Sequence, residues 1–108
     1  MSLVNEARVE QALTYLTGTD FSCADAKVAA ERWKYLAKRH RAVSILATTD
    51  KTTAQVKDAK AENDSEVIRA EEEYFKSLEA FEQMSAKRKT EQLVIEIWRT
   101  EQANLRKG

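Results

Sequence analysis

Apolar residues near the start of the chain recur at helical spacing. Val9, Ala12, Leu13 and Leu16 are three or four residues apart, which places them on one side of an α-helix over residues 3–17. Gly18 follows at the position where a glycine in a left-handed conformation often ends a helix. The pattern therefore predicts a short first helix that ends in a break over residues 18–22.

A second apolar row begins directly after this break. Ser22 can cap a helix over residues 23–47, and Phe21 precedes it as the residue that packs back onto the first turn. Ala26, Trp33, His40 and Ala47 lie on the predicted inner row at steps of seven, and Val43 belongs to the same row. Such steps indicate that this helix lies along another helix.

The third helix is the longest. The threonine-rich stretch 48–53 favours a turn, and Thr52 with Gln55 forms a capping box. Beyond it we expect one continuous helix over residues 53–106. The alternative is an interruption near Asn63–Ser65, with Ser65 capping a separate helix.

Helix lengths then predict the architecture. The first two helices together match the third, so a fold-back at the threonine turn places residue i roughly opposite residue 101 − i. Trp33 would lie near Val67 and Ile68. With no proline and two glycines in 108 residues, an all-β fold is excluded for want of turn residues. We expect one all-α domain, a long antiparallel, coiled-coil-like helical hairpin with two shorter helices packed along one long C-terminal helix.

Charge is balanced over the chain but not along it. Residues 27–41 carry six basic residues against Glu31, whereas residues 58–73 carry seven acidic residues against Lys60 and Arg69. In the predicted register these stretches face each other, which favours pairing between the arms. The alternative is a phosphate-binding track formed by Lys27, Lys34, Lys38 and Arg41.

The C-terminal end carries a second excess of positive charge. Six basic residues there oppose three glutamates, and the facing first helix is nearly neutral. The first hypothesis for the function is a non-enzymatic helical protein that works by binding another protein. This end is the candidate surface for the alternative, a small DNA- or RNA-binding accessory factor. The predicted contacts are Lys87, Arg88, Arg99 and Arg106.

The sequence contains no motif of catalytic or metal-binding residues. His40 is the only histidine, and we expect it to be half-buried and bonded across the hairpin near Glu62 or Asp64. Cys23 is the only cysteine, placed in the first turn of the predicted second helix, where a small packing residue is the default and a reactive thiol the alternative. We therefore predict no enzyme activity, no metal and no cofactor.

The cellular setting follows from composition. A single cysteine excludes an internal disulfide and suits a reducing cytoplasm. No stretch approaches the roughly 20 apolar residues of a membrane span. We expect a cytoplasmic protein that does not bind membranes.

Apolar residues on the third helix cover more than one of its faces. A single partner helix buries only one face, so the surplus predicts association into a homodimer or a larger oligomer. The predicted interface, with Trp98 as its anchor, consists of Val67, Ile68, Tyr74, Phe75, Leu93, Ile97 and Trp98.

The second half of the chain resembles a group of known proteins. The run Ile95-Glu96-Ile97-Trp98-Arg99 and the closing Asn104-Leu105-Arg106 carry the similarity. Over about residues 30–106 the chain resembles small all-helical accessory proteins of tailed phages and prophages, which mostly lack an assigned activity. The resemblance implies a phage accessory protein in the host cytoplasm, and it transfers no functional residue. Besides a second copy of itself, the candidate partner is another phage or host protein.

Overall fold

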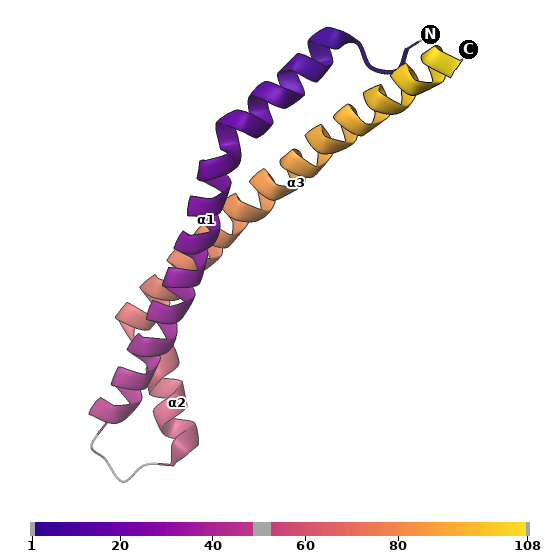
Figure 1. Ribbon diagram of the computed structural model, residues 1–108. Coiled ribbons are helices and arrows are strands. Elements are labelled where there is room, and N and C mark those ends of the chain that lie inside the picture. The colour runs from indigo at the N-terminus through magenta and orange to yellow at the C-terminus, as the bar shows by residue number, and fades with distance from the viewer. Residues whose placement is uncertain (1, 49–52, 108) are drawn as a thin grey trace. The chain divides into compact units, whose positions relative to one another are not determined.

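The computed structural model describes residues 2–48 and 53–107, and all the regular structure in these ranges is helical. Helix α1 spans Glu6–Ala47, α2 spans Ala54–Glu62 and α3 spans Ser65–Lys107. The chain packs as two compact units, one made of Met1–Ala24 with Glu82–Gly108 (unit 1) and one of Asp25–Phe81 (unit 2). In each unit a segment of α1 lies antiparallel to a segment of α3 (Figure 1). The predicted all-α helical hairpin is confirmed.

The predicted break in the N-terminal arm is wrong, because α1 runs without interruption through residues 18–22. No described residue has a positive φ, so Gly18 is an ordinary helical residue rather than a left-handed cap. The Thr19 hydroxyl donates to the Tyr15 carbonyl at 2.6 Å, one turn back, as in a helix interior. Phe21 is 84% exposed and packs onto no first turn.

The C-terminal arm is interrupted instead, so the prediction of one continuous helix over 53–106 is also wrong. At the end of α2 the Asn63 amide donates to the carbonyls of Ala59 and Lys60, and its side-chain Nδ2 donates to Ala59 at 2.9 Å. Asp64 then caps α3, because its Oδ1 accepts from the Glu66 amide at 2.9 Å and from the Val67 amide. Ser65 is the first residue of α3 rather than its cap.

The turn between α1 and α2 lies near its predicted place. Helix α1 ends at Ala47, and the Thr53 side chain caps α2 by accepting from the Val56 amide. Thr52, the predicted capping residue, and its neighbours 49–51 lie outside the described residues.

Small residues form the core of unit 2. Ala30, Ala61, Val67 and Ala70 are buried, and Val67 has the largest fully buried side chain among the described residues. Trp33 is half-buried and lines a pocket with Arg69 and Ala70, close to its predicted place opposite residue 68. Val43, predicted on the inner row, is 56% exposed, because the half-buried row of α1 continues through Ser44 instead.

Unit 1 has a core of similar size. Val4, Val9 and Ala12 are buried, while Leu13 turns outward and is 50% exposed. The ion pair between Arg8 and Glu91 links α1 to α3 two residues from the predicted register. Only two helices meet in this unit, so the core is one row of side chains wide.

The continuity of α1 at Gly18 can be tested by substitution. We expect Gly18→Ala to raise the free energy of unfolding by about 0.5–1 kcal/mol, because alanine is the better helix former. An added Cβ would meet no atom within 4 Å. Urea denaturation measures the change, and a loss of stability would indicate a left-handed turn at this residue.

The packing of Trp33 predicts a second stability change. We expect Trp33→Ala to lower the free energy of unfolding by about 2–3 kcal/mol, less than for a fully buried aromatic because the ring is half-exposed. Tyr35→Ala is the matched control, since Tyr35 is 62% exposed on the same helix and should cost under about 1 kcal/mol. Equal costs for the two variants would show that Trp33 makes no cross-helix contact.

Candidate functional site

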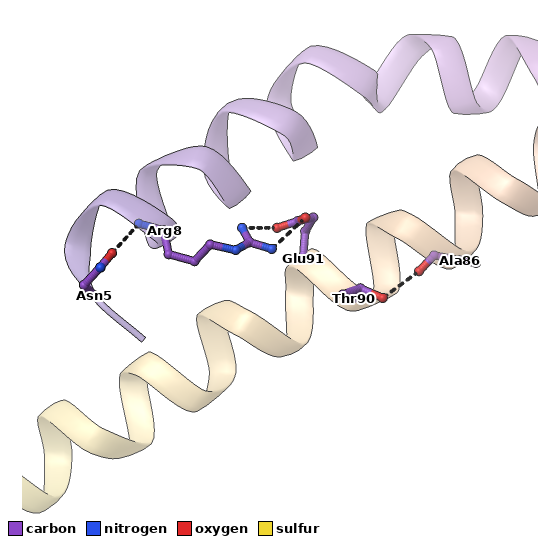
Figure 2. Close-up of polar contacts among 5 residues, drawn as sticks. All are labelled: Asn5, Arg8, Ala86, Thr90 and Glu91. Atoms are coloured by element: carbon purple, nitrogen blue, oxygen red, sulfur yellow. Dashed lines mark hydrogen bonds and ion pairs between the residues drawn. The ribbon is translucent and has the colours of Figure 1, made fainter. Parts of the chain in front are cut away.

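The helices of unit 1 are joined by a buried ion pair (Figure 2). Arg8 donates from its two terminal nitrogens to the two carboxylate oxygens of Glu91, at 2.6 and 2.9 Å. Glu91 is 6% exposed, whereas the Arg8 side chain keeps 37% of its surface in solvent. Asn5 holds the first turn of α1 in place, because its Oδ1 accepts from the Arg8 amide at 2.8 Å. The two-pronged geometry fixes both the spacing and the register of the two helices.

The pair changes the titration of both groups. The hydrogen bonds from Arg8 lower the pKa of Glu91, and the charges of Arg8 and Lys87 act in the same direction while burial opposes them. The same hydrogen bonds raise the pKa of Arg8. The carboxylate and the guanidinium therefore stay ionised together.

Arg88 lies between the helices of unit 1. Its guanidinium donates to the Leu16 carbonyl at 2.8 Å, to the Thr19 hydroxyl at 2.7 Å and to the Asp20 carboxylate at 2.5 Å. Its side chain is 17% exposed. Arg88 therefore binds α1, and its prediction as a nucleic-acid contact is wrong.

The other predicted nucleic-acid contacts do not form one patch with it. The Lys87 ammonium lies over the Tyr15 ring, 4.5 Å from its centroid. Arg99 and Arg106 are exposed, and Arg99 lines a shallow pocket together with Gln92 and Glu96. Because Arg88 faces α1, it does not join the other three cations on the exposed surface, and the role of Lys87, Arg99 and Arg106 as nucleic-acid contacts stays a prediction.

A second link joins the N-terminal segment to the end of α3. Glu101 accepts from the Ser2 hydroxyl at 2.5 Å and from the Leu3 amide at 2.8 Å. The Ser2 hydrogen bond is the main cause of the lowered pKa of Glu101. Sequence reasoning missed Arg8, Glu91 and Glu101, although the predicted register already placed residues 8 and 93 opposite each other.

The predicted interface residues fall into three groups. Val67 is fully buried inside unit 2, so its prediction as an interface residue is wrong. Ile68, Phe75 and Leu93 are 40%, 62% and 54% exposed. Tyr74, Ile97 and Trp98 are half-buried. The outward-facing apolar surface on α3 is therefore carried mainly by Ile68 and Phe75 in unit 2 and by Leu93 and Leu105 in unit 1.

Unit 2 contains an open groove between α1 and α3. The rings of Tyr74 and Phe75 lie against each other there, with centroids 5.2 Å apart and planes tilted by 43°. The groove is lined from α1 by Lys34, Ala37, Lys38 and Arg41 and from α3 by Glu71, Tyr74 and Phe75.

One end of this groove is tied to α2. Arg41 approaches Glu62 at 3.4 Å and Asp58 at 3.8 Å, as expected if the basic and acidic stretches pair. Both carboxylates are more than half exposed, so these contacts contribute little stability.

His40 is half-buried as predicted but lacks its predicted partner, and Cys23 lies away from a helix start. His40 is half-buried beside Trp33 and Glu66, and it forms no hydrogen bond with a described residue. Glu62 forms its ion pair with Arg41, and the Asp64 side chain caps α3. Cys23 is half-buried in the middle of α1, so it has no helix N-terminus to favour a thiolate.

Within the described residues, no group of three or more His, Cys, Asp or Glu side chains could hold a metal ion. None of the helices, over the residues described, has the length and apolarity to cross a membrane. Comparisons with known protein families, with curated proteins and with solved structures found no match.

The buried ion pair predicts how stability depends on pH. Because the folded-state pKa of Glu91 lies below its unfolded value of about 4.3, the pair stabilises the fold above that value and loses its contribution as the pH falls through the folded pKa. We expect the free energy of unfolding to fall more steeply below about pH 4.5 in the parent protein than in Glu91→Gln. Chemical denaturation at several acidic pH values measures this difference. Glu96→Gln, an exposed change one turn on, is the control, and equal slopes for the parent and Glu91→Gln would contradict the role of the pair.

Proposed function

We propose that the protein is a non-enzymatic helical interaction protein that works as a homo-oligomer. The observation that carries the proposal is the imbalance between buried and exposed apolar side chains. Among the described residues, the buried hydrophobic side chains are all alanine or valine, while twelve large hydrophobic residues are exposed. Association between chains would remove such apolar groups from water, which is favourable.

The surface area supports the same conclusion. The chain exposes 8331 Å², whereas a globular monomer of its mass exposes roughly 6100 Å². Small cores of this kind are usually supplemented by a disulfide, a metal or a second chain. The sequence has one cysteine, and residues 2–48 and 53–107 contain no metal-binding group. Of the three supplements to a small core, a second chain is therefore the one that this protein can use.

A role in binding also fits the surfaces. The groove of unit 2 is shallow and open. It is lined by the paired rings of Tyr74 and Phe75, and aromatic residues are enriched at protein interfaces. Under this proposal the protein acts by associating with itself and presenting its outer helix faces to a further protein.

Sedimentation equilibrium at micromolar concentration tests the proposal. We expect a mass of about twice the 12.3 kDa chain, or a multiple of it, and a thermal midpoint that rises with protein concentration. The concentration dependence separates association from simple chain stability. A folded 12.3 kDa monomer with a concentration-independent midpoint would refute it.

A further inference from the structure

We propose that two copies of the chain associate through the groove face of unit 2, with α1 of each copy packed on α3 of the other. The groove face is defined by Lys34, Ala37, Lys38, Glu71, Tyr74 and Phe75. This inference rests on the self-association proposed above and names its surface. It places the contact in unit 2 rather than at Trp98, the anchor expected from the sequence.

The apolar part of the groove face has the spacing of a second helix-packing row. Ile68, Phe75 and Leu78 are its apolar members, and the acidic Glu71 lies between the first two, so that steps of three or four residues separate neighbours on α3. They lie beside the row of Val67, Ala70 and Tyr74, whose first two members are buried against the rest of unit 2. A helix with two adjacent apolar rows can pack against two neighbours. The first row is used inside the unit through Val67 and Ala70, whereas Glu71 and Phe75 of the second row line the groove together with Tyr74.

Phe75 is the natural centre of such a contact. It is 62% exposed, and its ring is supported from one side by Tyr74. Ala37 opposite leaves room between the helices for an inserted side chain. Aromatic residues in pockets of this kind contribute a large part of the binding energy at protein interfaces.

The charges on the two walls of the groove face indicate which partner fits it. The α1 segment of unit 2, residues 25–47, carries six basic residues against Asp25 and Glu31, and the α3 segment, residues 65–81, carries five acidic residues against Arg69 and Lys76. The groove face itself holds Lys34 and Lys38 on one wall and Glu71 on the other. A nucleic acid or an acidic protein would meet attraction on one wall and repulsion on the other. A second copy matches both walls.

The same charges favour one way of stacking the helices of the two copies. In a two-fold dimer, stacking α1 on α1 would bring basic rows together and α3 on α3 would bring acidic rows together. Stacking α1 on α3 of the partner pairs opposite charges twice, once on each side of the axis. The favoured dimer therefore has its two-fold axis along the helix direction, and in it unit 2 of each copy contributes two helices to a four-helix bundle.

Two charge-reversed variants test the arrangement. Lys34→Glu with Lys38→Glu makes both walls acidic, and Glu71→Lys with Glu72→Lys makes both walls basic. We expect each variant alone to weaken self-association at least ten-fold by sedimentation velocity. An equimolar mixture should form a heterodimer, because each wall then meets its opposite.

Two controls keep the test specific. Arg32→Glu with Arg39→Glu changes the same number of charges on exposed positions of α1 outside the groove, and it should leave the dimer intact. Circular dichroism checks that each variant keeps its helix content. If a reversed variant does not fold, Phe75→Ala decides, because an exposed side chain is removed without changing charge, and we expect it to weaken association at least ten-fold.

The outcomes separate the two proposals. A monomeric parent protein refutes the homo-oligomer itself. A dimeric parent whose association is unaffected by Phe75→Ala and by both charge reversals leaves the oligomer standing and overturns the groove face. A mixture of folded, reversed variants that stays monomeric overturns the α1-on-α3 arrangement.

Discussion

Each unit of this protein is built from little more than two antiparallel helix segments, and that constraint determines most of its other properties. A helix with one long neighbour can bury only a narrow row of side chains. Alanine and valine fill that row, and Val67 has the largest fully buried side chain of the described residues. These small side chains let the helices approach closely, but they remove little apolar surface from water. The exposed Phe75, Leu93 and Leu105 are the counterpart of this thin core.

Where apolar packing is weak, polar contacts determine the register. Arg8 with Glu91, and Arg88 with Leu16 and Thr19, tie α1 to α3 at single positions. A row of alanines could slide by one turn at small cost, whereas a buried carboxylate left without its arginine would be expensive. Paired polar groups of this type are a known means of fixing alignment in helical assemblies. In unit 1 they specify the structure more than they stabilise it.

The sequence was sufficient for the helical class, the antiparallel hairpin and the approximate register, because these depend on apolar spacing and on helix length. It misplaced the interruption for a physical reason. Gly18 carries a strong local signal for a helix end, but the helix gains more by continuing, and Arg88 adds a hydrogen bond at the carbonyl of Leu16. Asn63 and Asp64 are a weaker sequence signal for a helix end. Their side chains, however, form hydrogen bonds with backbone groups at the end of α2 and at the start of α3. For the candidate site, exposure of Phe75 followed from apolar periodicity, whereas the burial of Val67 and Arg88 depended on which of two adjacent rows faces the neighbour.

The short helix α2 has a consequence for how the chain folds. Nine residues with one buried side chain, Ala61, are too few to be a stable helix alone, so the turn region is a poor place to begin. The firmest contact of unit 1 joins residues that are 83 positions apart in sequence. The chain must therefore close a long loop before that contact can form, and the lost chain entropy slows the step. Folding should therefore start among Ala30, Val67 and Ala70 in unit 2 and reach the chain ends last.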